Sequence, residues 1–586
     1  MSLAATNHAD ADSALTAGAT FRHNRRMSYL RFGLLALSLA ACGDGAQGVG
    51  GGAGSPVGGA GGIGASGGGE PLGAGGAGSL VGGAGGIANG GGGGGAGSLV
   101  GGAGGIAHGG DGGGGGDGGF GGGGFGGGGG GPNCFAETCD GTDEDCDGIA
   151  DDGVCTVLQI VGDDLFLAGI YRDSIDGAVF DADGNLYLTG SVSEQANFGD
   201  GFVAYQNGYI ASFDAGGALR WKYLWGNFGG FTASNHGLAI AVSDDKVCAT
   251  GSFSGLVSFG GADHQAAGLS DGVVVCLNPA TGGYLWDRAF GGSSTDWGGG
   301  IAIGVSGDVF VSGAFQNNVD FGGGTIVGAG YSDMFVARWA GDDGGYEWAT
   351  TIGCTALDSA DEIALDDSEN VYVSAVQGDT CDFGGGPRTP WDIGGSGVLL
   401  ALDSTGDYRW DVTHPSLGAV SFRGLGVQST GNVVAGGNFR GTLNLGGPVV
   451  AAETGDSLEA LVVSFDDDGN FLWQYTPQGP GGSTVDALAI GTGDEIVATG
   501  EFRAGVAFGV TPHTMTAGEA DIFVLGLTSS GAYWSDATIG GPSIDGGGSV
   551  AIGADSAIAV GAVVGGPIAG HGYNAQGDAI LLRVEQ

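Results

Sequence analysis

Gly251-Ser-Phe-Ser-Gly-Leu-Val-Ser-Phe-Gly260 decides the fold, because its pattern of Gly-x-Phe followed by a second Phe-Gly recurs along the chain. Successive copies are separated by 61, 62, 62, 62, 63 and 61 residues. So regular a period indicates a repeat architecture in which each copy is one structural unit. The copies begin at Gly190, Gly251, Gly313, Ala375, Gly437, Gly500 and, in decayed form, Gly561.

Each unit is expected to contain four short strands. In the second unit these strands fall at 238–242, 246–251, 272–277 and 284–288, and Asp- and Gly-rich turns separate them. Four-stranded units repeated around a ring are propeller blades. The sequence therefore predicts an all-β fold, a seven-bladed β-propeller of four-stranded blades, over residues 157–586.

The two ends of the repeat region predict how the ring closes. The seventh unit stops after its third strand, 578–584, and lacks the strand that carries a tryptophan in the other units. Residues 164–169 stand where that strand is missing, with Phe166 in the place of the tryptophan. Because unpaired sheet edges promote aggregation, we expect this N-terminal strand to complete the last blade. The tryptophans in step with the repeat are Trp221, Trp286, Trp348, Trp410, Trp473 and Trp534.

The repeat resembles the bacterial β-propeller repeat family of large surface and secreted proteins over nearly all of 157–586. Residues 276–286 also resemble a pyrroloquinoline-quinone-type repeat, in which the tryptophan belongs to a packing motif and not to a cofactor site. We interpret the tryptophans accordingly, as core between blades.

The N-terminus has the pattern of an export and lipidation signal. Arginines within 25–31 lead into the apolar run 33–39, and small residues then precede Cys42. A basic start, a short apolar core and small residues before the cut are typical of a signal peptide. The ending Leu-Ala-Ala-Cys resembles the bacterial lipobox, which implies a diacylglycerol on Cys42 and attachment to the cell envelope, most simply the outer membrane. The signal region is 1–41, with Met27 a possible true start.

Residues 42–132 are mostly Gly, Ala and Ser and are expected to form a disordered tether. Glycine loses much conformational entropy on folding, and this segment has almost no apolar surface to offset the loss. A Gly-rich coil of about 90 residues spans roughly 50–55 Å.

A small Cys- and Asp-rich module is expected at 133–156. Its alternating aspartates, followed by a glycine, match the first half of a calcium loop, although no glutamate closes the loop. The segment resembles the short Cys-Asp-Gly-x-Asp-x-Asp-Cys-Asp-Gly metal-binding motif of bacterial surface proteins and the calcium repeats of thrombospondin. A weak Ca²⁺ site is predicted, with an acidic disulfide knot without metal as the alternative. The candidate ligands are Asp143, Asp145, Asp147, the Ile149 carbonyl, Asp151 and Asp152.

The nine cysteines divide into Cys42 and eight others, as expected for an exported protein with four disulfides. In the repeat region, Cys248 with Cys276 and Cys354 with Cys381 are predicted to pair within or between neighbouring strands. The remaining candidates are Cys134, Cys139, Cys146 and Cys155.

The net charge of −48 argues against nucleic acid as a partner and suits divalent cations, basic partners or simple solubility. No nucleophile elbow, His-Glu-x-x-His pair or phosphate loop occurs, so no enzyme is predicted. The histidines of the region are scattered over different units, at His236, His264, His414, His513 and His571.

Three functions remain open from the sequence. The first is a membrane-anchored scaffold that presents the propeller to a protein or glycan. The second is an envelope-assembly factor, and the third is a propeller enzyme of lyase, glycosidase or quinoprotein type, whose carboxylates would meet at the central channel.

Overall fold

The structure is a computed structural model that describes residues 159–167, 173–203, 205, 207–226, 235–390, 396–413, 419–453, 457–515, 519–541, 543, 545–554, 556–565 and 578–585. All of these belong to Gly128–Gln586, the second of two compact units in the chain. Within these ranges every regular element is a β-strand, and no helix there could cross a membrane.

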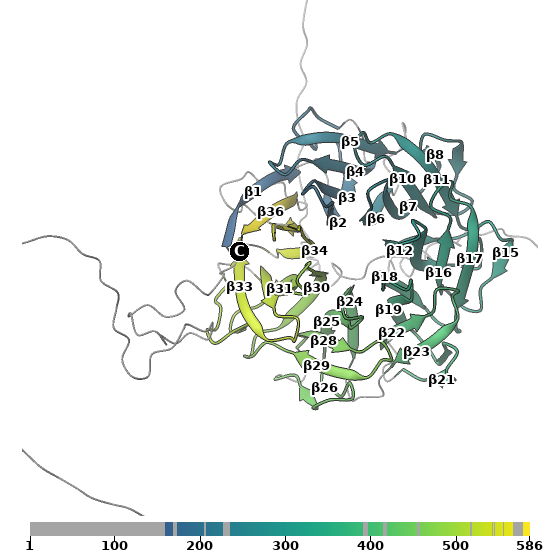
Figure 1. The fold of residues 1–586 in the computed structure, drawn as a ribbon. Helices are drawn as coiled ribbons and strands as arrows, with labels where there is room; N and C mark the ends of the chain where they lie inside the picture. The colour runs from purple at the N-terminus through teal and green to yellow at the C-terminus, as the bar shows by residue number, and fades with distance from the viewer. Residues whose placement is uncertain are drawn as a thin grey trace, which may run out of the picture. The chain divides into compact units, whose positions relative to one another are not determined.

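Seven four-stranded antiparallel sheets are arranged as blades around an axis, which confirms the predicted seven-bladed β-propeller (Figure 1). The innermost strands surround the centre of the ring in Figure 1. They are β2 Ser174–Phe180, β6 His236–Val242, β12 Trp297–Ile303, β18 Ser359–Leu365, β24 Val420–Val427, β30 Ser483–Ile490 and β34 Gly546–Ile552.

The second strand of each blade ends with the residues of the repeated motif. These strands are β3 Leu186–Val192, β7 Val247–Phe253, β13 Val309–Phe315, β19 Val371–Gln377, β25 Val433–Phe439, β31 Ile496–Phe502 and β35 Ile558–Val564. The third strands are β4 Asn207–Phe213, β10 Asp271–Leu277, β16 Asp333–Trp339, β22 Ser396–Leu402, β28 Glu459–Phe465, β32 Asp521–Leu527 and β36 Asp578–Glu585.

The outer strand of each blade is paired on one side only. These strands are β5 Leu219–Trp225, β11 Tyr284–Phe290, β17 Tyr346–Ile352, β23 Tyr408–Val412, β29 Phe471–Tyr475, β33 Tyr533–Ile539 and, in the seventh blade, β1 Gln159–Leu167.

Long loops connect the second and third strands, and four of them form a small hairpin. The hairpins are β8 Leu256–Ser258 with β9 Asp263–Gln265, β14 Asn318–Asp320 with β15 Thr325–Val327, β20 Cys381–Asp382 with β21 Pro387–Arg388, and β26 Thr442–Leu443 with β27 Val450–Ala451. Tight turns make the connections at the other end of the blades, and their first aspartates accept backbone N–H groups, as Asp466 does from Asn470 at 2.7 Å.

The tryptophans interlock successive blades, as the sequence predicted. Trp286 of the second blade donates its indole N–H to the Gly341 carbonyl in a turn of the third, at 2.9 Å. A Cβ at Gly344 in that turn would lie 2.6 Å from the same indole, and Gly344 has a φ of 68°. Glycine is needed there both for the left-handed backbone and for the close approach of the ring. The same arrangement recurs at Trp221 with Gly282, Trp348 with Gly406, Trp410 with Gly469 and Trp473 with Gly531.

The first glycine of the repeated motif accommodates a β-bulge on the inner strand. In the second blade, Gly237 pairs with Gly251 but Ala239 pairs with Thr250, so Leu238 is an extra residue. A Cβ on Gly251 would lie 1.9 Å from the His236 carbonyl oxygen. Every inner strand has a register shift at the corresponding position. In six blades the glycine that reveals the repeat faces this bulge, and in the fourth Ala375 faces a wider one that contains Asp361 and Glu362.

The ring closes as predicted, but with a different register. Strand β1 pairs antiparallel with β36 and supplies the outer strand of the seventh blade (Figure 1). In the second blade Trp286 lies opposite Cys276, whose counterpart in β36 is Arg583. Arg583 pairs with Gly162, and Phe166 pairs with Ile580. Gly162 rather than Phe166 therefore has the tryptophan position, four residues earlier in the strand.

Candidate functional sites

The residues extruded by the seven bulges form a ring on the strands nearest the axis, which we call the axial ring. Its members are neighbours across blades: a Cβ on Gly299 would lie 2.8 Å from the Asp361 carbonyl oxygen, and Arg423 Nη1 lies 3.0 Å from Asp486 Oδ1. The ring consists of Asp176, Leu238, Gly299, Asp361 with Glu362, Arg423, Asp486 and Gly548. Bulges are frequent beside functional sites, because they redirect one side chain out of the sheet.

The members of the axial ring differ in charge from blade to blade. Four of its members are carboxylic acids and one is an arginine, while three blades contribute Leu or Gly. Asp176 accepts a hydrogen bond from Ser174 Oγ at 2.5 Å, and Thr484 Oγ1 donates to Asp486 Oδ2 at 3.3 Å. From the sequence alone, it was an open question whether carboxylates of different blades meet near the central channel. The ring contains such carboxylates at Asp361 and Glu362 in blade four and at Asp486 in blade six, with the arginine of blade five between them.

A second recurrent grouping lies on the outer flank of alternate blades, and we call each copy a rim clamp. In the second blade, Asp287 accepts hydrogen bonds from Tyr284 Oη at 2.7 Å and pairs with His264 Nε2 at 2.5 Å. In the sixth, Asp536 accepts from Tyr533 Oη at 2.8 Å and pairs with His513 Nε2 at 2.8 Å.

The fourth blade has the same clamp with arginine in place of histidine. Arg388 Nε and Nη2 donate to the two oxygens of Asp411 at 2.8 and 3.0 Å, and Tyr408 Oη donates at 2.8 Å. The basic residue of each clamp follows the second phenylalanine of the motif by five residues. These phenylalanines are Phe259, Phe383 and Phe508. This spacing is a signal in the sequence, and the interpretation of the histidines as scattered overlooks it.

The rim clamps hold a long loop against the outer strand of its own blade. Burial, together with the hydrogen bond to Asp287, raises the pKa of Tyr284 to about 12, so the phenol remains a neutral donor. Arginine replaces histidine in one copy, and an acid–base role would not survive that exchange because guanidinium does not release its proton. Three interchangeable copies therefore indicate a structural role.

A third grouping is a buried acid at the start of the inner strand. Asp296 accepts N–H groups from Gly292 at 2.8 Å and Gln316 at 2.8 Å, and so joins the incoming loop to the loop after the second strand. Burial, opposed by these two bonds and reinforced by Asp271, raises its pKa to about 6. Asp545 has the same two types of bond, to Gly541 and Gly565. We call the set the blade-start acids: Asp173, Asp296, Asp358 and Asp545, with Asn235 in the second blade.

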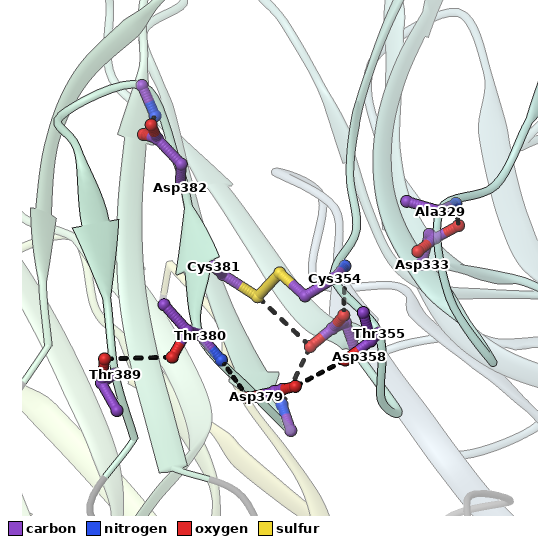
Figure 2. The surroundings of a disulfide bond; sticks show 12 residues. Ala329, Asp333, Cys354, Thr355, Asp358, Asp379, Thr380, Cys381, Asp382 and Thr389 are labelled. Atoms are coloured by element: carbon purple, nitrogen blue, oxygen red, sulfur yellow. Dashed lines mark hydrogen bonds between the residues drawn. A yellow bond between two sulfur atoms is a disulfide. The ribbon is translucent and has the colours of Figure 1, made fainter. Parts of the chain in front are cut away.

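Both disulfides predicted in the repeat region are formed. Cys248 and Cys276 face each other on β7 and β10 within one blade. Cys354, after β17, is joined to Cys381 in β20 and so links the third blade to the fourth (Figure 2). Sulfurs of the second pair lie with the carboxylate of Asp358 in a group whose potential ligand atoms are all within 4.8 Å of one another.

The other predicted site residues lie outside the described residues. They are the lipidation site Cys42, the metal candidates Asp143, Asp145, Asp147, Ile149, Asp151 and Asp152, and the cysteines Cys134, Cys139, Cys146 and Cys155. These sites remain predictions from the sequence, as do His414 and His571, which are also outside the described ranges.

No protein-family model matches the chain, and no curated protein matches it. Several solved structures are similar. A quinohemoprotein alcohol dehydrogenase from Comamonas testosteroni is 11% identical, with 73% of this chain and 76% of that chain covered and a TM-score of 0.34. An ulvan lyase of a polysaccharide lyase family is 11% identical, with 72% and 96% covered and a TM-score of 0.40. Regucalcin from Agrobacterium tumefaciens, a calcium-binding protein, is 13% identical, with 59% and 87% covered and a TM-score of 0.27. Identities this low assign no activity to the chain.

Proposed function

We propose that this protein is an exported, lipid-anchored binding scaffold whose propeller takes up a cationic segment of a protein partner at the axial ring. The observation that carries the proposal is the divergence of this ring. The motif glycines, the interlocking tryptophans and the bulges repeat from blade to blade, whereas the extruded residue changes from blade to blade. In a repeat fold, uniform positions build the scaffold, and positions that differ are available for recognition.

The charge of the ring and of the chain favours a cationic ligand. Four carboxylates and one arginine leave the ring with a formal charge of about −3, on a chain with a net charge of −48. Such a field accelerates the approach of basic groups and disfavours anionic ones. A neutral glycan gains nothing from this negative field, so we favour a basic protein segment over a glycan as the ligand.

The anchor and the Asp-rich module complete the proposal. A diacylglycerol on Cys42 would hold the chain at the outer membrane, and the tether 43–132 would keep the propeller clear of the bilayer. Ca²⁺ bound by Asp143, Asp145 and Asp147 would stiffen the junction between tether and propeller. Palmitate label should enter the wild type and not Cys42→Ala; equal labelling would remove the anchor from the proposal.

Binding is tested on the full chain made lipid-free by Cys42→Ser. The probe is a fluorescent oligolysine peptide, with a neutral oligosaccharide as the contrasting ligand. Replacing two ring acids, by Asp361→Asn with Glu362→Gln, should weaken peptide binding by about tenfold, since both charges lie in the ring.

The matched control removes the same charge from exposed turns, by Asp342→Asn with Asp367→Asn. It should change affinity less than about twofold, because exposed charges are screened. Equal losses in both double variants would mean that only the net charge attracts the peptide, and the axial ring would be rejected as the site. Saccharide binding that depends on the ring would replace the protein partner with a glycan.

A further inference from the structure

Cys354 and Asp358 lie in the loop between β17 and β18, and Cys381 of β20 meets them at the junction of the third and fourth blades. Figure 2 shows the disulfide beside the Asp358 carboxylate, and Cys381 Sγ lies 3.6 Å from Asp358 Oδ1. Because a disulfide sulfur carries no proton, this is a contact and not a hydrogen bond. It is the only group of three potential metal ligands found at such close range among the described residues.

Asp358 is held in place before any ligand arrives. Its Oδ2 accepts the Cys354 N–H at 2.8 Å, and its Oδ1 accepts the Gly378 N–H at 2.9 Å. The side chain is fully buried. Each carboxylate oxygen keeps a second lone pair, which is available to a cation.

The surroundings of the pair are negative. Asp333 and Asp379 lie close enough to Asp358 to interact with it electrostatically. Two cysteines released here would have to remain neutral thiols or have their thiolate charge balanced by a cation. A divalent cation provides that balance for both sulfurs and for the carboxylate.

We infer that reduction of the Cys354–Cys381 disulfide opens a site for a thiophilic divalent cation of the Zn²⁺ type, with Cys354, Cys381 and Asp358 as ligands. Zn²⁺ binds thiolate sulfur at about 2.3 Å and carboxylate oxygen at about 2.0–2.2 Å, and so needs the sulfurs roughly 3.8 Å apart. The Cα atoms are 5.4 Å apart, and both cysteines lie at loop or hairpin positions, so a change of side-chain rotamer can separate the sulfurs. A solvent molecule would complete the coordination.

The chemistry balances with a named reductant. One phosphine and one water convert the disulfide into two thiols and one phosphine oxide. Binding of Zn²⁺ then forms two Zn–S bonds and releases the two thiol protons. The oxidised protein has no thiolate at this site to hold the ion. Oxidation of the two thiolates to the disulfide would therefore release the metal.

The other disulfide supplies an internal control. Cys248 and Cys276 lie directly opposite each other in the ladder, with Cα atoms 4.1 Å apart, among apolar side chains that include Val274 and Trp286. Reduction there gives two buried thiols on a rigid sheet with no acidic group completing a metal site among the described residues.

The test uses the full chain with its other five cysteines replaced by serine, at Cys42, Cys134, Cys139, Cys146 and Cys155. After phosphine reduction, Zn²⁺ and Co²⁺ are titrated under anaerobic conditions, with circular dichroism to verify the fold. About one ion per chain is expected, with a sulfur-to-Co²⁺ charge-transfer band. The oxidised chain should show no such band, and an ion held by the Asp-rich module at 133–156 gives none either because the cysteines of that module are replaced.

Variants then separate the two pairs. The double change Cys354→Ser with Cys381→Ser should abolish the band, whereas Cys248→Ser with Cys276→Ser should leave it. Asp358→Asn should lower the affinity for Zn²⁺ by about tenfold or more. Since Asp358 also bonds two backbone groups, a second measurement is needed: Zn²⁺ should protect Cys354 and Cys381, but not Cys248, from alkylation mapped by mass spectrometry.

A folded, reduced chain that binds no Zn²⁺ would overturn the inference. So would a charge-transfer band that survives loss of Cys354 and Cys381, or alkylation protection that falls equally on both pairs.

Discussion

The two disulfides of the propeller close loops of nearly equal length in very different surroundings. Sequence separations are 28 for Cys248–Cys276 and 27 for Cys354–Cys381. Chain entropy alone would therefore assign each about 3–4 kcal/mol of stabilisation. The first lies inside one blade, fully buried among apolar side chains, and the second joins two blades beside Asp358. Any difference in their behaviour must come from position, and position can be tested.

The largest expected difference is in the rate of reduction without denaturant. Cys354 is 9% exposed and lies in a loop, whereas Cys248 and Cys276 are 0% exposed in the middle of a four-stranded sheet. Local opening exposes a loop sulfur at much lower free energy than the unfolding that frees a central strand. We expect dithiothreitol to reduce Cys354–Cys381 about 100-fold faster or more. Timed alkylation and mass spectrometry measure both rates, and similar rates would show that the junction opens only with the whole domain.

Serine substitution should separate the pairs by about 2–4 kcal/mol in unfolding free energy. Two hydroxyls at Cys248 and Cys276 would be buried among apolar side chains, at about 1–3 kcal/mol each beyond the lost disulfide. A hydroxyl at Cys381 would instead lie beside Asp358 and could donate to it. Urea denaturation of the two double variants measures the difference. The corresponding alanine variants are the control, and their gap should be smaller because no hydroxyl is buried.

A smaller effect, on the pH dependence of stability, is expected from Asp296, the counterpart of Asp358 in the third blade. It tests whether a blade-start acid owes its environment to the blade and not to nearby sulfurs. Asp296 occupies the same position in the third blade without a cysteine nearby, and its pKa is raised from 3.8 to about 6. Because the folded-state pKa is above the unfolded-state value, the favourable contribution is complete below about pH 4 and is lost as pH rises through about 6.

The variant Asp296→Asn should lack this loss, which we put at about 2 kcal/mol between pH 4 and 7 after allowing for partial solvation. Urea denaturation at both pH values, wild type against variant, measures it. Asn235 supplies the same side chain in the second blade. An unchanged pH dependence would mean that Asp296 is not the group responsible.

The smallest expected effect concerns the rim clamp, which in the fourth blade acts alongside the disulfide. Arg388→Ala leaves the buried Asp411 with the Tyr408 hydroxyl, at a cost of about 1–2 kcal/mol. His264→Ala in the second blade should cost a similar amount, since its hairpin is held in the same way. Thermal unfolding of the two variants is the measurement. A loss of ligand binding without a loss of stability would contradict the structural role of the clamps.

The sequence was sufficient for the fold because its strongest signals come from backbone geometry. The motif glycines face a bulge in six blades, and the turn glycines admit a tryptophan at five junctions between blades, so both recur at a fixed place in the repeat. Cysteine pairing was predictable at Cys248 and Cys276 because they fall on strands that neighbour each other.

The sites were less predictable, because they depend on register. Phe166 resembled a tryptophan substitute, yet the pairing of β1 with β36 places Gly162 at that position, four residues earlier. The axial ring could not be read from the chain, since a bulge residue such as Asp176 has no pattern of its own and is defined by the pairing around it. His264 and His513 recur in equivalent positions, but only alignment on the motif phenylalanines reveals it.

The closing strand has a consequence for the making of the protein. Gln159 pairs with Glu585, so the ribosome must add 426 residues (585 − 159) after Gln159 before its partner is complete. At about 5–20 residues per second, β1 waits roughly 20–85 s before its partner exists. During that time it is an uncovered edge that could pair with another chain. The ring therefore cannot close before β36 has been made, and until then the edge of β1 must be kept from other chains.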